Sequence, residues 1–139
     1  MSKIVLVSCA SKKLSSPSKA KDLYISPLFK KQLAYAQTLY PDKLFILSAK
    51  YGLLETEKII EPYDLTLNFL SIQDVKKWAD KVLHQLQQVT HLDSDEFVFL
   101  AGERYRKFIL PKLKHFTVPL KGLGIGKQLQ WLKEELKDE

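Results

Sequence analysis

The stretch FILSAKYGLL, residues 45–54, decides the fold because it begins as a strand and ends as something else. Its first three residues are apolar, as in a strand that is buried on both faces of a parallel sheet. The residues that follow are small, charged, aromatic and flexible, namely Ser48, Ala49, Lys50, Tyr51 and Gly52. Ligands of open α/β sheets bind beyond the carboxyl ends of the strands. We therefore expect this strand to deliver Ser48, Lys50, Tyr51 and Gly52 into a ligand site.

Three further segments have the character of strands, and helical patterns separate them. The strands are expected at residues 4–8, 43–49, 96–101 and 115–120, and the helices at residues 27–39, 71–89, from about 102 to 113, and 126–137. Pro119 places the last strand at an edge of the sheet or at its own end. This alternation predicts one α/β domain over residues 1–139, with a three-layer α/β/α architecture. The sheet is expected to be mainly parallel, four-stranded and Rossmann-like.

Two helix starts carry clear signals. Ser26 precedes Pro27 at the first helical position, which is a favoured start. Ser71 and Asp74 resemble a capping box with Asp in place of the usual Glu. The helix after Ser71 shows apolar residues at spacings of three and four, namely Ile72, Val75, Ala79, Val82, Leu83 and Leu86. In contrast, residues 8–26 are expected to form a long loop, and residues 50–67 show little helix or strand character.

Composition excludes several classes of protein. The 139 residues are 45% apolar and 27% charged, as in an ordinary globular protein. No apolar run approaches the roughly 20 residues that cross a membrane. The single cysteine permits no intrachain disulfide and fits a cytoplasmic location. The net charge of +6 permits an anionic partner, and the four lysines between Lys12 and Lys21 form either an anion site or a solvated loop.

The segments that follow the four strands should open on one rim of the sheet. They are residues 8–13, 48–54, 101–105 and 119–127. The first segment supplies Ser8, Cys9, Lys12 and Lys13, of which a lysine is able to bind phosphate as a point charge. Cys9 is a candidate nucleophile because neighbouring lysines favour the thiolate. The competing interpretation of Cys9 is a small buried residue that closes the strand.

The sequence EPYD, residues 61–64, places two carboxylates and a phenol on one short turn. Glu61 or Asp64 is a candidate general base, or a partner for the polar edge of a nucleobase. Tyr63 is a candidate stacking residue, and Lys50 a candidate reactive amine if burial lowers its pKa. The competing interpretation of residues 61–64 is a polar surface turn.

Two glycine-containing segments are candidate anion contacts. Gly102, Glu103 and Tyr105 lie where a strand turns into a helix, and backbone amides at such a point receive anions. The alternative is a plain strand-to-helix turn. Residues 122–127, GLGIGK, do not match a phosphate-binding loop, because the glycines are one residue too close and Gln follows the lysine. Gly124 and Gly126 therefore offer only a flexible turn with exposed amides.

No metal site and no cofactor are expected. His84, His91 and His115 lie in separate segments, and no tight His, Cys or Asp spacing accompanies them.

Several motifs resemble a family of small uncharacterised bacterial and phage proteins. They are SCxxKK from Ser8, LYxSxLF with Tyr24 and Ser26, ILSAKYGLL from residue 46, IxPYDxTL from residue 60, AGERY from residue 101 and GxGxG from residue 122. More distantly, the chain is similar to the YaaA peroxide-stress proteins and to the catalytic domain of archaeosine synthase. The resemblance implies a fold that handles nucleobases, including 7-deazaguanine bases, and the YaaA proteins are associated with DNA binding and protection from oxidative damage.

Three hypotheses for function follow. The first is an enzyme that acts on a nucleotide, on a modified base or on an N-glycosidic bond in nucleic acid. Lys12 and Lys13 would hold a phosphate, Tyr51 or Tyr63 would stack on the base, and Cys9 or Lys50 would react. The second is a non-catalytic nucleic-acid-binding or protective protein. The third is a small-ligand sensor or a subunit of a larger assembly; the oligomeric state stays open.

Overall fold

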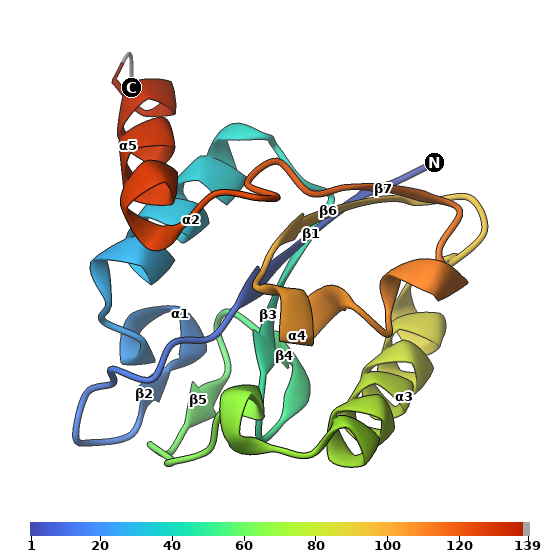
Figure 1. Ribbon diagram of the computed structural model, residues 1–139, viewed down its shortest axis with the longest axis horizontal. Helices are drawn as coiled ribbons and strands as arrows, with labels where there is room; N and C mark the ends of the chain where they lie inside the picture. The colour runs from blue at the N-terminus through green and yellow to red at the C-terminus, as the bar shows by residue number, and fades with distance from the viewer. Residues whose placement is uncertain (138–139) are drawn as a thin grey trace.

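The computed structural model describes residues 1–137 of the chain (Figure 1). The strands are β1 (Lys3–Ser8), β2 (Ser18–Lys19), β3 (Lys43–Ser48), β4 (Gly52–Glu55), β5 (Ile59–Ile60), β6 (Glu96–Leu100) and β7 (His115–Thr117). The α-helices are α1 (Ala20–Leu23), α2 (Pro27–Thr38), α3 (Ile72–Val89), α4 (Glu103–Arg106) and α5 (Ile125–Glu135). Two 3₁₀ turns, η1 (Leu67–Phe69) and η2 (Leu110–Lys112), complete the elements.

The central sheet has five strands, in the order β4-β3-β1-β6-β7. The expectation of four strands is therefore wrong, because β4 adds an antiparallel strand beside β3. Gly52 makes this possible: its φ of +75° turns the chain back directly after β3, and glycine adopts this conformation without steric cost. The other neighbouring pairs are parallel, so the fold is mixed α/β with a mostly parallel sheet.

Alternate residues of the strands pack into two hydrophobic clusters. In β1, Ile4 and Leu6 belong to a cluster that includes residues of α3, whereas Val5 and Val7 belong to a cluster with residues of α2 and α5. This alternation follows from the pleat, which sends successive side chains to opposite sides of a sheet. Figure 1 shows α3 on one side of the sheet and α2 and α5 on the other.

Both predicted helix starts are confirmed. The Ser26 hydroxyl accepts a hydrogen bond from the Phe29 amide at 3.2 Å, and the Ser71 hydroxyl accepts one from the Asp74 amide at 3.1 Å. The predicted apolar face of α3 is wrong at its first residue, because Ile72 is 48% exposed. The buried stripe of α3 begins one turn later at Val75, and Trp78, which the spacing pattern omitted, lies within it.

Residues 8–26 and 50–67 contain more structure than the sequence predicted. The short strands β2 and β5 pair antiparallel, with Ser18 opposite Ile60. Two backbone hydrogen bonds extend this contact into α1, from the Ala20 amide to the Lys58 carbonyl and from the Lys21 amide to the Thr56 carbonyl. The two segments are therefore held together by backbone bonds. We call this arrangement the β2–β5 ribbon.

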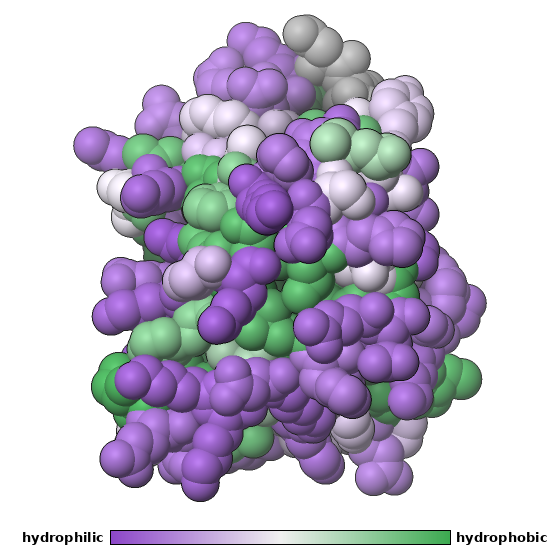
Figure 2. Space-filling model, turned by 90° about the vertical axis from the view of Figure 1, so that its right-hand side faces the viewer, coloured by the Kyte–Doolittle hydropathy of each residue, from purple (hydrophilic) through white to green (hydrophobic). Residues whose placement is uncertain are grey.

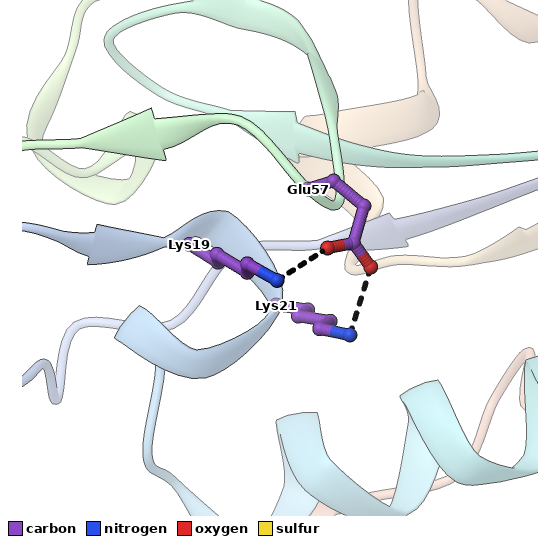
Figure 3. A network of polar contacts seen from close by, with 3 residues as sticks. All are labelled: Lys19, Lys21 and Glu57. Atoms are coloured by element: carbon purple, nitrogen blue, oxygen red, sulfur yellow. Dashed lines mark ion pairs between the residues drawn. The ribbon is translucent and has the colours of Figure 1, made fainter.

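One carboxylate joins two lysines beside this ribbon. The Glu57 carboxylate lies 3.1 Å from the Lys19 ammonium and 2.8 Å from the Lys21 ammonium (Figure 3). All three side chains are substantially exposed to solvent. Exposed ion pairs contribute little to stability, because water and salt screen them. The backbone bonds, rather than these charges, therefore hold the ribbon.

Strand order places a crevice at the carboxyl ends of β1 and β6. After β1 the chain continues to β3, which lies on one side of β1, and it later returns to β6, which lies on the other side of β1. The loops after β1 and β6 therefore diverge, which is the position where α/β sheets bind ligands. Strand β7 lies at the edge of the sheet, as Pro119 predicted.

The outer surface next to α3 is mainly polar. Figure 2 shows this face, on which hydrophilic residues predominate and hydrophobic residues gather in a band across the middle. Within residues 1–137, none of the helices combines the length and the apolar character that a membrane crossing requires.

Candidate functional site

Cys9 and Tyr105 meet at the crevice between β1 and β6. The Cys9 thiol donates a hydrogen bond to the Tyr105 hydroxyl at 3.6 Å, and the Leu67 amide donates to the same hydroxyl at 3.4 Å. The ring of Trp78 lies edge-on to the ring of Tyr105, with centroids 5.5 Å apart. Burial raises the pKa of Tyr105, and the nearby Cys9 adds to this effect. The phenol therefore stays protonated and joins the β1 loop, η1 and α4.

A chain of three hydroxyl groups lies beside this contact. The Tyr63 hydroxyl lies 2.6 Å from the Tyr24 hydroxyl and 2.8 Å from the Ser48 hydroxyl. Ser48 is fully buried, and its oxygen also accepts hydrogen bonds from the amides of Lys50 and Tyr51. Burial raises the pKa of Tyr24 to about 12 and raises that of Tyr63 as well. This chain fixes the Tyr63 ring in one orientation.

Lys13 is the cation that the fold brings to these tyrosines. Its ammonium lies 4.5 Å from the centre of the Tyr63 ring and 5.7 Å from that of the Tyr24 ring. A β-bridge between Lys13 and Tyr24 holds the backbone of this segment in place. Burial lowers the pKa of Lys13, while the nearby Cys9 and Asp64 oppose that shift. Lys13, Cys9 and Asp64 therefore interact electrostatically in one region.

A hollow of about 450 Å³ opens at this point of the surface. It is lined by Ser11, Lys13, Pro62, Tyr63 and Asp64. The hollow is shallow and open, so a ligand bound there would stay partly exposed to solvent. The hollow combines a cation, a carboxylate and an aromatic ring, which suits a planar ligand with polar edges. Ser11 and Pro62 were not among the predicted site residues. The signal for them was their position within SCASKK and EPYD, two residues from Lys13 and one residue from Tyr63.

Three predicted charged residues do not line this hollow. Lys12, Lys50 and Glu61 are exposed, and the Lys50 ammonium lies 5.3 Å from the ring centre of its neighbour Tyr51. The burial that would favour Lys50 as a reactive amine is therefore absent. Burial does lower the pKa of Lys13, the lysine that lines the hollow. Tyr51 does reach the site, because its ring lies edge-on to Tyr63 at 5.7 Å between centroids.

Three other predicted residues have structural positions. Ser8 ends β1 opposite Leu47, and Ser26 caps α2. Gly52 is buried, and a Cβ atom at this position would lie 2.3 Å from Oε1 of Gln85. The same oxygen accepts a hydrogen bond from the Leu53 amide at 2.8 Å. Gly52 therefore serves the turn between β3 and β4 and the close approach of α3.

The residues after β6 and β7 form a second, smaller hollow. It measures about 250 Å³ and includes Gly102, Glu103 and Gly122 in its lining. Gly124 caps α5, and both Gly124 and Gly126 are exposed and do not line either hollow. The residues that follow β6 therefore face two different places. Tyr105 contacts Cys9, whereas Gly102 and Glu103 face the second hollow.

A larger hollow lies away from these residues. It measures about 710 Å³ and is bordered by the end of α3 and the loop that leads into β6, with Thr90, His91 and Ser94 in its lining. This loop precedes β6, so the hollow lies toward the amino ends of the parallel strands. Among residues 1–137, no group of three His, Cys, Asp or Glu side chains is placed to hold a metal ion.

Comparison with known families covers nearly the whole chain. Residues 4–134 match the model of DUF6884, a family of unknown function. The chain belongs to the DUF6884 family. The matched region contains every residue of the hollow and of the Cys9–Tyr105 contact. Neither the curated proteins nor the solved structures include a significant match.

Proposed function

We propose that this DUF6884 protein binds a nucleobase, either in a free nucleotide or in nucleic acid, and acts on it as an enzyme. One observation carries this proposal: the Lys13 ammonium, the Tyr63 ring and the Asp64 carboxylate line one hollow next to the crevice of the sheet. A purine or pyrimidine presents a flat face together with donors and acceptors on its edge. Each of these features has a partner among the three side chains.

The roles follow from the chemistry of each group. Tyr63 offers an aromatic surface for stacking, which tolerates any base. Lys13 donates to a phosphate or to a carbonyl oxygen of the base, and Asp64 accepts from an amino or imino group. Tyr51 lies edge-on to Tyr63 and extends the aromatic wall.

Cys9 is the reactive group that the geometry favours. It is half-buried just after the carboxyl end of β1, its thiol contacts the Tyr105 hydroxyl, and it lies near enough to Lys13 to affect the pKa of that ammonium group. A cysteine beside a cation is a common arrangement for nucleophilic attack. Amide or amidine chemistry on a deazaguanine-type base and cleavage of an N-glycosidic bond are the two reaction classes that we propose. Lys50 and Glu61 are less suited, because both are exposed and neither lines the hollow.

Three broader assignments belong to the same proposal. We assign the sheet to the three-layer Rossmann-like class, supported by the parallel β3-β1-β6-β7 core and by the two hydrophobic clusters. A distant relation to the YaaA proteins and to archaeosine synthase is supported by the motifs from residues 46 and 60. A cytoplasmic location is supported by the single free cysteine.

The binding step is tested with two matched lysine variants. Guanosine monophosphate, deazaguanine and ribose 5-phosphate are titrated by calorimetry against the unmodified protein, Lys13→Ala and Lys12→Ala. We expect base-containing ligands to bind, Lys13→Ala to weaken them at least tenfold, and Lys12→Ala to leave them unchanged. Equal weakening by both variants, or equal binding of ribose 5-phosphate, would contradict a base site in the hollow.

Catalysis is tested separately from binding. The protein and its Cys9→Ala variant are incubated with nucleotides and with modified oligonucleotides, and the products are analysed by mass spectrometry. We expect conversion of a base or release of a base, and its loss in Cys9→Ala with ligand affinity retained. Conversion at an unchanged rate in Cys9→Ala would remove Cys9 from the reaction.

A non-catalytic nucleic-acid-binding protein is the second candidate. The net charge of +6 favours it, because phosphate contacts supply most of such binding. In that case an oligonucleotide binds with affinity that falls steeply with salt concentration, and no base is converted. Binding of free nucleotides that does not respond to salt favours the enzyme instead.

A further inference from the structure

Two short elements beside the hollow present opposite sides to the site and to solvent. In η1, Leu67 is fully buried and its amide reaches the Tyr105 hydroxyl, whereas Phe69 is 90% exposed. In α4, Tyr105 is buried and contacts Cys9, whereas Arg104 is half-buried and its Nη1 donates to the Leu70 carbonyl at 3.5 Å. Figure 1 shows η1, drawn in green between β5 and α3, close to α4. The site side chains and this outer surface therefore share one rigid support.

The outer surface combines aromatic side chains with cations. The half-buried ring of Phe108 lies between two ammonium groups, at 5.4 Å from Lys76 and 5.7 Å from Lys107. Residues 103–107 carry Arg104, Arg106 and Lys107 against the single acid Glu103. Ile72, which begins α3, adds a half-exposed apolar side chain. We call these residues the η1–α4 patch: Phe69, Ile72, Lys76, Arg104, Lys107 and Phe108.

Phe69 is the unusual member of the patch. A side chain of this size that is 90% exposed gains little from folding, since burial of a Phe is worth about 1.5–3 kcal/mol. Its backbone is nevertheless ordered, because the Thr66 hydroxyl caps η1 and the Leu70 amide donates to the Leu67 carbonyl. The fold therefore holds an exposed ring at a fixed position, one residue from the carbonyl that Arg104 contacts.

We propose that the η1–α4 patch binds single-stranded nucleic acid, with Phe69 stacking on a base and Arg104 and Lys107 contacting phosphates. Proteins that bind single strands combine a positively charged track with aromatic rings on which bases stack. Because η1 and α4 also carry Leu67 and Tyr105, a strand on the patch would lie next to the Cys9–Tyr105 contact. This inference rests on the proposed function for its choice of ligand, and it makes the substrate a polymer rather than a free nucleotide.

The patch is tested with a fluorescein-labelled oligothymidylate in anisotropy titrations at several salt concentrations. Phe69→Ala should weaken binding roughly fivefold or more, because stacking on an aromatic ring is lost. Phe69→Tyr should restore it. Tyr40→Ala is the matched control, since Tyr40 is also 90% exposed but lies in the turn between α2 and β3. Arg104→Ala should reduce the slope of log affinity against log salt by about 0.7, the value for one phosphate contact with a single strand.

Several results would overturn the proposal that the η1–α4 patch binds single-stranded nucleic acid. They are failure of the oligonucleotide to bind the unmodified protein, equal affinities of Phe69→Ala and Tyr40→Ala, and a Phe69-dependent affinity for phosphatidylserine vesicles in place of the oligonucleotide. Thermal melting of each variant shows that a loss of affinity is not a loss of folding.

Nucleotide titrations separate this proposal from the function of the hollow. If guanosine monophosphate does not bind but the oligonucleotide still requires Phe69, the hollow proposal fails and the patch stands. If Lys13→Ala abolishes nucleotide binding but Phe69→Ala leaves the oligonucleotide affinity unchanged, the proposal for the patch is wrong and the proposal for the hollow is retained.

Discussion

Replacement of Tyr63 by phenylalanine tests the hydroxyl chain that shapes the candidate site. The substitution removes one oxygen and keeps the ring, so stacking surface and packing volume are retained. The lost hydroxyl lies 2.6 Å from that of Tyr24 and 2.8 Å from that of Ser48. Two partly buried hydrogen bonds therefore disappear with a single atom.

The magnitude follows from these two bonds. A typical internal hydrogen bond contributes about 0.5–1.5 kcal/mol, so their loss costs about 1–3 kcal/mol. The Ser48 oxygen still accepts from the amides of Lys50 and Tyr51, but the fully buried Tyr24 loses its partner. An unpaired buried group moves the expected cost to about 2–3 kcal/mol. For a chain of 139 residues this corresponds to a fall in melting temperature of roughly 7–10 °C.

A double-mutant cycle isolates the bond between the two tyrosines. Urea unfolding gives the free energy of unfolding for the unmodified protein, Tyr63→Phe, Tyr24→Phe and the double variant. Tyr24→Phe removes only the shorter bond and should cost about 1 kcal/mol. The double variant should cost little more than Tyr63→Phe, which gives a coupling energy of about 1 kcal/mol. Tyr40→Phe, at an exposed position, should leave stability unchanged.

Two outcomes would refute this reasoning. If Tyr63→Phe unfolds at the same urea concentration as the unmodified protein, the hydroxyl chain contributes nothing. If the two single variants add without coupling, the Tyr24 and Tyr63 hydroxyls do not bond to each other.

Other substitutions and pH changes give further expected outcomes. Gly52→Ala should lower the free energy of unfolding, measured by urea unfolding, by about 1–3 kcal/mol, because the φ of Gly52 is positive and the added Cβ would meet Gln85. Gly102→Ala is the control and should change this free energy little, because the space around Gly102 is open. Asp95→Asn should lower it by about 1–3 kcal/mol, since the carboxylate accepts from the amides of His91 and Ser2. These bonds lower the pKa of Asp95, so its stabilisation is present above the ordinary value of 3.8 and is lost as pH falls through the lowered value; acid titration of unfolding in both proteins checks this. Burial raises the pKa of Tyr24 from 10.0 to about 12, so its contribution to stability is complete below pH 10.0 and is lost as pH rises toward about 12, as ultraviolet absorbance of tyrosinate can follow. Nucleotide affinity should fall as pH rises through the pKa of Lys13, which burial places below 10.5, and Lys13→Arg should remove that fall in calorimetric titrations.

The core of the fold could be predicted because its signals are local. Strands β1, β3 and β6 are continuous apolar runs, and the helix caps at Ser26 and Ser71 depend on residues three positions apart. The added strand could not be predicted in the same way. Strand β4 has only four residues, GLLE, and its place beside β3 depends on the positive φ of Gly52. The β2–β5 ribbon joins pairs of residues about forty positions apart, and two-residue strands have no periodicity to detect.

The candidate site was predicted in outline and changed in its details. The expectation that site residues follow the strands correctly grouped Cys9, Ser48 and Tyr105, because parallel strands end at the same edge of the sheet. The choice among neighbouring residues depended on side-chain direction, which sequence spacing does not give after a strand ends. Lys13 faces Tyr63 because its backbone forms a bridge with Tyr24, whereas Lys12 and Lys50 are exposed.

The hollow lies between two segments that leave the sheet, and its geometry depends on what joins them. Lys13 belongs to the segment after β1, whereas Tyr63 and Asp64 follow β5. The Glu57 ion pairs join these segments only at the surface, where such pairs contribute little to stability and are screened by salt. The Tyr24–Tyr63–Ser48 hydroxyl chain joins the same segments to β3 in a largely buried setting, where salt has little effect. The position of the Tyr63 ring relative to Lys13 is therefore set by buried phenols, which stay neutral across the physiological pH range, and not by the exposed charges around them.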